Sequence, residues 1–152
     1  MGISSGELPE APDPTPLRTW FLRCRAAGLI GQDPARYDGY AFGNISLRAH
    51  PGFLISGTQT GGKAALTTDD LAWVVTFDTD RNRLEATGPA RPSSEAMSHG
   101  EIYRALPQAR AVIHVHSPPD PTEADPLGPA QPGAESLAAT SRQRGGGRQP
   151  RR

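Results

Sequence analysis

Apolar residues recur at helical spacing between Leu17 and Leu29. Glycines and an Asp33-Pro34 turn signal follow this run, so the pattern predicts one helix that ends before them. The expected buried face consists of Leu17, Trp20, Phe21 and Cys24. We therefore expect Cys24 to be a small buried side chain and not a nucleophile.

The central part of the chain alternates short apolar runs with turn residues, a pattern typical of β-strands. Residues 40–48 and 52–56 flank a proline-glycine turn and predict an antiparallel hairpin. A capped helical turn at residues 67–71, a strand at residues 73–77 and a further strand around Leu84 are expected next. His50, which precedes the proline, is expected to be a simple turn residue.

A second helix is expected to open at Ser93 and Ser94 and to end at Pro107. Its apolar residues Met97, Ile102, Tyr103 and Leu106 lie broadly on one side. His99 belongs to the same helix, and we expect it to be partly exposed and not to bind a ligand.

The apolar run at residues 111–117 predicts a strand that carries two histidines, His114 and His116. Side chains alternate between the faces of a strand, so both imidazoles point to one face while Ile113 and Val115 point to the core. Imidazole is a preferred ligand of zinc and of other divalent transition metals. The pair is a candidate metal site, although an isolated pair of this kind is more often two ordinary polar residues.

Three clusters of small polar residues lie upstream, each at the edge of an apolar segment. They are Gly43-Asn44-Ile45-Ser46, Ser56-Gly57-Thr58 and Pro92-Ser93-Ser94-Glu95. Amides and hydroxyls at a helix start form an anion site, and a glycine allows close backbone approach. Each cluster alone also has a local explanation as a helix cap or a hairpin exit. Together with the histidines they predict a single site.

Helices that alternate with a largely antiparallel sheet place the chain in the α/β class. The chain has 152 residues, which suits one domain. We expect a flexible segment at residues 1–16 and the domain at residues 17–117. Residues 118–152 are rich in proline, glycine and arginine and cannot build a core. For this tail a disordered end is favoured over a nucleic-acid-binding segment, because it lacks the aromatic residues that stack on bases.

The charges balance, with 16 basic and 16 acidic residues, so the composition favours neither a nucleic acid nor a membrane as partner. A single cysteine allows no internal disulfide, which fits a cytoplasmic location. The start of the chain combines acidic residues with prolines, so we expect neither a signal peptide nor an anchor there.

In order and separation, the three clusters and His114-Val115-His116-Ser117 resemble the N-terminal part of the class II aldolase/adducin family. The resemblance covers about residues 17 to 118. It implies a three-layer α/β/α fold with a mixed, mostly antiparallel sheet, and a homo-oligomer, usually a tetramer. It also implies an aldolase-type lyase that acts on a small sugar phosphate or related hydroxy-carbonyl compound through a metal-stabilised enediolate.

The resemblance further assigns roles to individual residues. It implies phosphate binding by Asn44, Ser56, Gly57, Ser93 and Ser94. It implies that His114 and His116 bind Zn²⁺ or another divalent metal, and that Glu95 is the catalytic acid/base near that metal and assists in holding it.

The resemblance stops after Ser117-Pro118, where family members continue with a third zinc histidine and a catalytic tyrosine. This chain has no histidine after His116 and no tyrosine after Tyr103. We therefore expect a C-terminally truncated domain with weakened metal binding. Two interpretations stay open: a lyase domain, or a non-catalytic adducin-like or degenerate remnant.

Overall fold

The computed structural model describes residues 10–117 of the chain. The elements are α1 (Thr15–Ala26), β1 (Gly31–Gln32), η1 (Tyr37–Gly39), β2 (Ala41–Phe42), β3 (Asn44–Arg48), β4 (Phe53–Ser56), η2 (Thr68–Asp70), β5 (Leu71–Asp78), β6 (Arg83–Thr87), α2 (Ala96–Ala105) and β7 (Ala111–His114). Helix α1 begins two residues before the predicted domain boundary at residue 17. The predictions for residues 1–9 and 118–152 lie outside the described residues.

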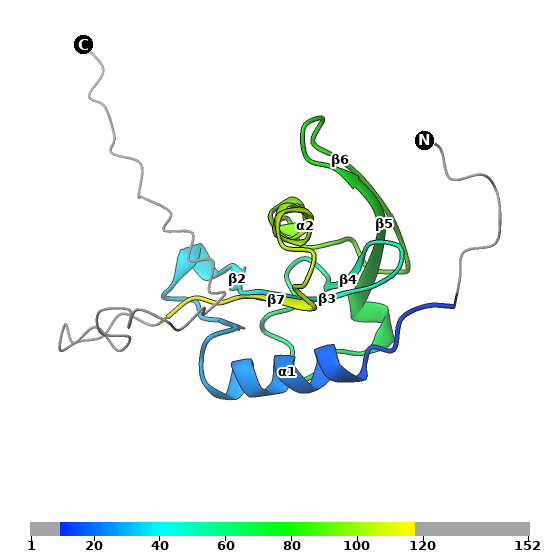
Figure 1. Cartoon of the computed structure of the whole chain (residues 1–152). Coiled ribbons are helices and arrows are strands. Elements are labelled where there is room, and N and C mark those ends of the chain that lie inside the picture. The colour runs from blue at the N-terminus through cyan, green and yellow to red at the C-terminus, as the bar shows by residue number, and fades with distance from the viewer. Residues whose placement is uncertain (1–9, 118–152) are drawn as a thin grey trace, which may run out of the picture.

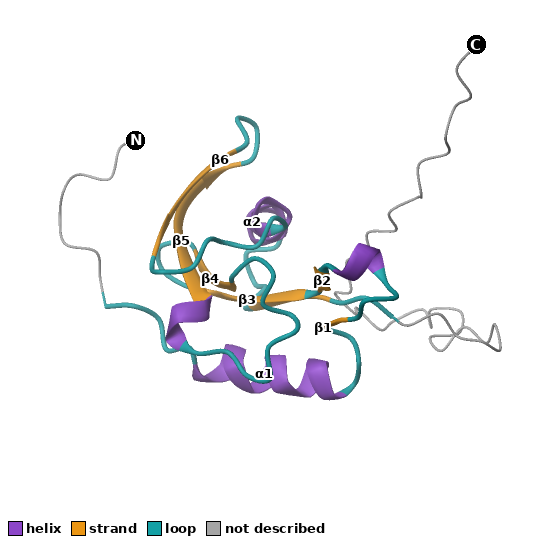
Figure 2. Cartoon of the chain, turned by 180° about the vertical axis from the view of Figure 1, so that it is seen from behind, coloured by secondary structure: helices purple, strands orange, loops and turns teal. Residues whose placement is uncertain are grey.

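Five strands form one sheet in the order β6-β5-β4-β3-β7, and β1 pairs with β2 beside it. Helix α1 covers one face of the large sheet and α2 covers the other (Figure 1). The view from behind shows the same three layers (Figure 2). The predicted α/β/α fold is confirmed, and every strand pairing between residues 10 and 117 is antiparallel.

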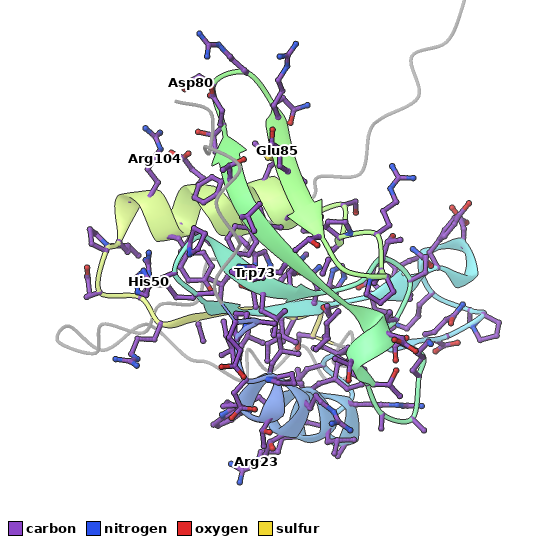
Figure 3. All side chains as sticks on the ribbon, turned by 90° about the vertical axis from the view of Figure 1, so that its right-hand side faces the viewer. Arg23, His50, Trp73, Asp80, Glu85 and Arg104 are labelled. Atoms are coloured by element: carbon purple, nitrogen blue, oxygen red, sulfur yellow. The ribbon has the colours of Figure 1, made fainter. Side chains whose placement is uncertain are left out.

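Alternation along the strands divides the core between the two faces of the sheet. Leu54 of β4 packs with Trp73 in the cluster on the α1 side, whereas its neighbours Phe53 and Ile55 pack on the α2 side. Trp73 lies among the packed side chains of the sheet, while labelled charged residues such as Arg23 lie at the periphery (Figure 3). This period of two is the one that a sheet buried on both faces requires.

Helix α1 forms as predicted, with one correction to its buried face. Leu17, Phe21 and Cys24 are buried, at spacings of four and three residues that place them on one face. Trp20 is not part of this face: its side chain is 47% exposed, and the Arg23 guanidinium lies 4.9 Å from the centre of its ring. The indole therefore gains its contact from a neighbouring cation and not from the core.

Helix α2 begins at Ala96, two residues after the predicted start, and its buried face differs from the apolar residues of its sequence. The buried residues are Ala96, His99, Gly100 and Tyr103. Met97, Ile102 and Leu106 are only partly buried. The predicted partial exposure of His99 was therefore wrong, since this residue is 1% exposed. Neither helix in the described part is both long and apolar enough to cross a bilayer.

The predicted hairpin is confirmed as β3 and β4, which pair antiparallel. Its first strand is shorter than predicted, because Gly43 adopts a φ of 80° and separates β2 from β3. The last strand is also shorter, since β7 ends at His114. Val115 follows the strand and is 38% exposed, so its predicted burial was wrong. Ile113 packs against the core as expected.

The predicted helical turn is confirmed as η2. Asp70, its last residue, forms hydrogen bonds with several other segments of the chain. Its carboxylate accepts hydrogen bonds from the Thr67 amide and from Lys63 Nζ, at 2.8 Å and 2.5 Å. Its backbone carbonyl accepts the Gly57 amide at 2.7 Å. Hydrogen bonding to Lys63, followed by that to Thr67, lowers the pKa of Asp70.

We expect Asp70→Asn to lower the free energy of unfolding by about 1 to 2 kcal/mol at pH 7, because charged acceptors make the stronger hydrogen bonds. Urea denaturation followed by circular dichroism measures the change. Lys63→Met is the control, since it leaves the bonds to Thr67 intact and should cost less. Equal losses for the two variants would show that the bonds from Asp70 to Thr67 add nothing to the bond with Lys63.

Candidate functional site

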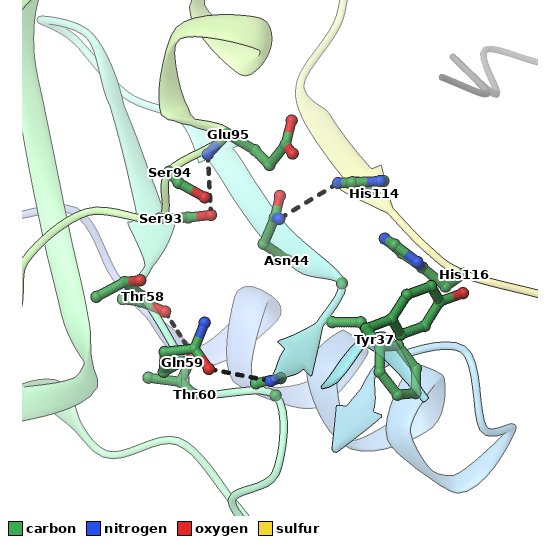
Figure 4. Close-up of a pocket in the computed structure, with 15 residues that line it drawn as sticks. Tyr37, Asn44, Thr58, Gln59, Thr60, Ser93, Ser94, Glu95, His114 and His116 are labelled. Carbon is green, nitrogen blue, oxygen red and sulfur yellow. Dashed lines mark hydrogen bonds between the residues drawn. The ribbon is translucent and has the colours of Figure 1, made fainter. Parts of the chain in front are cut away.

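One polar pocket collects most of the predicted site residues, and its cavity volume of about 160 Å³ suits a small molecule. The pocket is lined by Tyr37, Ala41, Phe42, Gly43, Asn44, Gly57, Thr58, Gln59, Thr60, Gly61, Ser93, Ser94, Glu95, His114 and His116. Figure 4 shows the serines and Glu95 on one side, the histidines on the other and Asn44 between them. Residues far apart in the sequence therefore meet at the ends of β3, β4 and β7 and at the start of α2.

The two histidines lie close together. Their ring centroids are 4.8 Å apart, with an angle of 40° between the planes. His114 is the last residue of β7, and the His116 amide donates to the Leu29 carbonyl just beyond the strand. Both imidazoles line the same pocket, which is the arrangement that the alternation of side chains predicts.

The surroundings of His116 favour its neutral form. Burial lowers the pKa of this imidazole, nearby His114 and Arg36 lower it further, and the charge of Glu95 opposes the change. A metal ion needs an unprotonated ring nitrogen, so the neutral form is the one competent to bind.

Asn44 joins the histidine side of the pocket to the interior. It stands opposite His114 in the register of β3 and β7, and its Nδ2 donates to His114 Nδ1 at 3.3 Å. Its Oδ1 accepts from Nε2 of the buried His99 at 2.5 Å. Burial, followed by the proximity of His114, lowers the pKa of His99 to about 3. His99 is therefore neutral at physiological pH.

The opposite wall contains the start of α2. The Ser93 hydroxyl accepts from the Glu95 amide at 3.3 Å, and Ser93 is buried whereas Ser94 is exposed. Glu95 precedes the first residue of α2 and is partly exposed. Hydroxyl groups, a carboxylate and the positive end of the helix dipole thus face one small space.

Two of the predicted phosphate-binding residues, Ser56 and Gly57, stabilise the fold around the pocket. Ser56 is 1% exposed and does not line the pocket; its hydroxyl accepts from the Ile45 amide at 3.1 Å. A side chain at Gly57 would lie 2.9 Å from the Asp70 carbonyl oxygen and 3.0 Å from Ala90 Cβ. The close backbone approach that this glycine permits is therefore to the protein itself.

Three backbone amides of this wall are also paired within the chain. Those of Gly57, Thr58 and Ser93 donate to backbone carbonyl groups. These three amides are therefore engaged by the protein, while the hydroxyl and carboxamide groups of the pocket are donors available to an anion.

The aromatic wall of the pocket is a feature that the sequence patterns did not predict. The Tyr37 ring meets His116 edge-on at 4.7 Å, and the Phe42 ring lies 5.5 Å from His116. Tyr37 precedes an Asp-Gly turn and adopts a φ of 49°, which no apolar pattern reveals. The turn signal at residues 38–39 was the available indication that this segment bends back.

Of the three residues predicted to bind a metal, only His114 and His116 lie side by side. Between residues 10 and 117, no three histidine, cysteine, aspartate or glutamate side chains are grouped closely enough to hold a metal ion. Glu95 shares the pocket with the histidines but does not complete such a group. The zinc-ligand and acid/base roles remain predictions.

Comparisons with known proteins bear on these residues. Residues 33–120 match the family model described as class II aldolase and adducin N-terminal domain. The chain is 37% identical over 94 residues to a methylthioribulose-1-phosphate dehydratase of Enterobacter sp. (strain 638), covering 62% of this chain and 41% of the relative. It is 39% identical over 77 residues to a 5-methylthioribulose-1-phosphate/5-deoxyribulose-1-phosphate aldolase of Rhodospirillum rubrum. This match covers 50% of this chain and 31% of the relative.

Among solved structures, the l-fuculose-1-phosphate aldolase of Thermus thermophilus is similar, with 32% sequence identity and a TM-score of 0.45. The match covers 65% of this chain and 42% of the aldolase chain. The chain thus spans about two fifths of the length of the first of these relatives. The family match covers more than half of the chain and includes the pocket residues from Tyr37 to His116. The predicted resemblance is confirmed, and the chain belongs to the class II aldolase and adducin N-terminal domain family.

Proposed function

We propose that this chain supplies the N-terminal half of the active site of a divalent-metal-dependent lyase acting on a small sugar phosphate. The observation that carries the proposal is the single pocket in which two neighbouring imidazoles face a carboxylate and two serine hydroxyls. The names of the relatives, which include dehydratases and an aldolase of methylthioribulose-1-phosphate, suggest a 1-phosphorylated ketose as the substrate class.

In this proposal His114 and His116 hold the metal, for which Zn²⁺ is the first choice. The fit rests on the ring separation of 4.8 Å and on the neutral form of His116 that its surroundings favour. A bound cation would polarise the substrate carbonyl and stabilise the enediolate charge. A further ligand has to come from outside residues 10–117, from the remaining chain or from another copy in the homo-oligomer that the family suggests.

Glu95 is proposed as the group that moves a proton at the substrate carbon next to the carbonyl. It lines the pocket and is partly exposed, so a substrate carbon could approach it. Ser93 and Ser94, with the Asn44 amide at the centre of the pocket, are proposed to hold the phosphate. Tyr37 and Phe42 form an apolar wall against which the rest of a small substrate would pack.

Metal binding is the direct test. The full chain, purified with added Co²⁺, is expected to bind one equivalent, and His114→Ala is expected to weaken binding about a hundredfold. Isothermal titration and the cobalt absorption spectrum measure affinity and ligand geometry. His50→Ala is the matched control, because His50 is exposed and lies outside the pocket.

Less than about a tenth of an equivalent of bound metal, for Zn²⁺, Mn²⁺ and Co²⁺ alike, would contradict the metal-dependent function. Turnover of methylthioribulose-1-phosphate, with Glu95→Gln as control, then tests the reaction itself. A loss of turnover that leaves metal affinity unchanged would support proton transfer by Glu95.

A non-catalytic, adducin-like module is the second candidate. The specific observation in its favour is that the described residues gather two metal ligands and not three. This candidate predicts no turnover on any sugar phosphate, even when the metal is bound.

A further inference from the structure

Asn44 is held between two imidazoles. Its Oδ1 lies 2.5 Å from His99 Nε2, and its Nδ2 lies 3.3 Å from His114 Nδ1. A carboxamide has one acceptor end and one donor end, so the direction of both bonds follows from the orientation of this amide. His99 Nε2–H donates to Asn44, and Asn44 donates to His114.

The chain of hydrogen bonds continues between the sheet and helix α2. His99 is neutral and carries its proton on Nε2, so its Nδ1 accepts from the Ser46 hydroxyl at 2.6 Å. That hydroxyl has only one proton, so it accepts from the Tyr103 hydroxyl at 2.8 Å. The five residues Tyr103, Ser46, His99, Asn44 and His114 therefore form a relay in which each side chain donates to the next.

The topology explains why these residues meet. Asn44 and Ser46 occupy alternate positions of β3, opposite His114 and Val112 of β7. Val112 packs in the cluster on the α2 side, so these alternate positions face that helix. Helix α2 presents His99 and Tyr103, one turn apart, to the same layer.

The relay is almost completely enclosed. Ser46, His99, Tyr103 and Asn44 are 0%, 1%, 3% and 7% exposed. In the part of the chain that the structure describes, no buried side-chain nitrogen or oxygen lacks a partner. Loss of one member would leave a buried donor or acceptor unsatisfied, and this cost holds the side chains in position.

We propose that His99 is a positioning residue, which fixes the side chain of Asn44 and, through it, the ring of His114 at the pocket. His99 itself does not line the pocket, so it acts only through Asn44. With Asn44 donating to Nδ1 of His114, neutral His114 carries its proton on Nε2, so Nε2 can bind a ligand only after the bonds of the relay reverse.

The relay accommodates either tautomer of His114. A half-turn of the Asn44 amide exchanges its donor and acceptor ends, so that His114 Nδ1–H donates to Oδ1 and Nδ2 donates to His99. His99 Nδ1–H then donates to Ser46, and Nε2 of His114 carries a free lone pair. Partners of this kind set the tautomer and orientation of metal-binding imidazoles.

The positioning role is tested without metal by nuclear magnetic resonance of the full chain. In the wild type, the Asn44 carboxamide and the His114 ring are expected to have order parameters close to those of the backbone. In His99→Phe both should fall to flexible values, below about 0.6. His99→Gln, which keeps a donor and an acceptor on a planar group, should restore most of this order.

Tyr103→Phe is the matched control. It also removes one buried hydrogen-bonding group, but the bond between Ser46 and His99 remains, so Asn44 should stay ordered. If His99→Phe does not fold, Ser46→Ala removes the anchor of His99 through a smaller truncation and should loosen Asn44 in the same direction.

The consequence for metal affinity rests on the proposed function. We expect His99→Phe to weaken Co²⁺ binding about tenfold and to shift the cobalt spectrum, whereas Tyr103→Phe changes neither. In an Asn44→Ala background, His99→Phe should change the affinity no further, because the effect passes through Asn44.

Three outcomes would overturn the positioning role. They are an ordered Asn44 and His114 in His99→Phe, equal loosening in Tyr103→Phe, and additive effects of the Asn44 and His99 substitutions on Co²⁺ affinity. A wild-type chain that binds no metal but loses order in His99→Phe would instead contradict the proposed function and leave the positioning role supported.

Discussion

Gly52→Ala is expected to lower the free energy of unfolding by at least about 4 kcal/mol, or to prevent folding altogether. Gly52 lies at the turn between β3 and β4 with a φ of +69°, a region that side chains other than glycine rarely adopt. A Cβ placed there would lie 1.7 Å from the Val74 carbonyl oxygen and 2.8 Å from its carbon. Both atoms belong to the backbone of β5, an interior strand that pairs with β4 and β6 and cannot move without disturbing these pairings.

Gly28→Ala separates the two causes of this loss. Gly28 has a φ of +73°, but a Cβ there would meet no atom within 4 Å. Its substitution should therefore cost only the backbone strain, about 1 kcal/mol. Urea denaturation of both variants, followed by circular dichroism, gives the comparison. Equal losses would show that overlap with Val74 does not determine the stability of this hairpin.

The sequence predicted the scaffold well, because the apolar pattern of each strand and helix agrees with the layer it enters. Strands β3, β4 and β5 alternate between two buried faces, and the short apolar runs between turn residues already indicate strands there. The face of α2 was missed for a physical reason. Its buried positions include His99 and Gly100, a polar and a side-chain-free residue that a hydrophobicity pattern places outside the core.

Gly100 explains in part why the buried face of α2 contains few apolar side chains. A Cβ at this position would lie 2.7 Å from the Phe77 ring, so the helix approaches β5 closely only because the side chain is absent. Burial of His99 depends in turn on partners from β3, which no local pattern in α2 contains. Both facts belong to tertiary packing and not to the helix itself.

For the candidate site, the sequence predicted which residues lie near the pocket better than it predicted what each of them contacts. Clusters of small polar residues do converge on one pocket with His114 and His116. Ser56, however, supports the Ile45 amide, and the backbone around Gly57 is paired within the chain. A motif shows which residues lie near a site, whereas the choice between holding the fold and facing the ligand depends on three-dimensional partners.

Acid is expected to destabilise the folded chain through His99, and this loss should begin well above the pH at which carboxylates titrate. Burial lowers the pKa of His99 to about 3, from an ordinary value of 6.5. Between these two values the unfolded chain binds more protons than the folded one, so stability that is complete above pH 6.5 is lost as the pH falls. The loss is about 1.4 kcal/mol per pH unit, or about 2 kcal/mol at pH 5.

The groups that face His99 also favour its neutral form and so a lowered pKa. His114 on β7 also lowers the pKa of His99, and the neighbouring Asn44, Ser46 and Tyr103 carry no charge that would stabilise an imidazolium. The pKa of His116 is lowered as well, so its titration adds a loss of the same sign. Urea denaturation between pH 7 and pH 4.5 measures the combined slope.

His99→Gln isolates the contribution of this residue, because glutamine does not titrate and keeps groups that can bond to Asn44 and Ser46. The variant is expected to be less stable than the wild type at pH 7 but to lose less stability toward pH 5, so the two curves converge. Parallel curves would mean that His99 has the same pKa in the folded and unfolded chains over this range. In that case the acid sensitivity would have to come from His116 or from groups outside the relay.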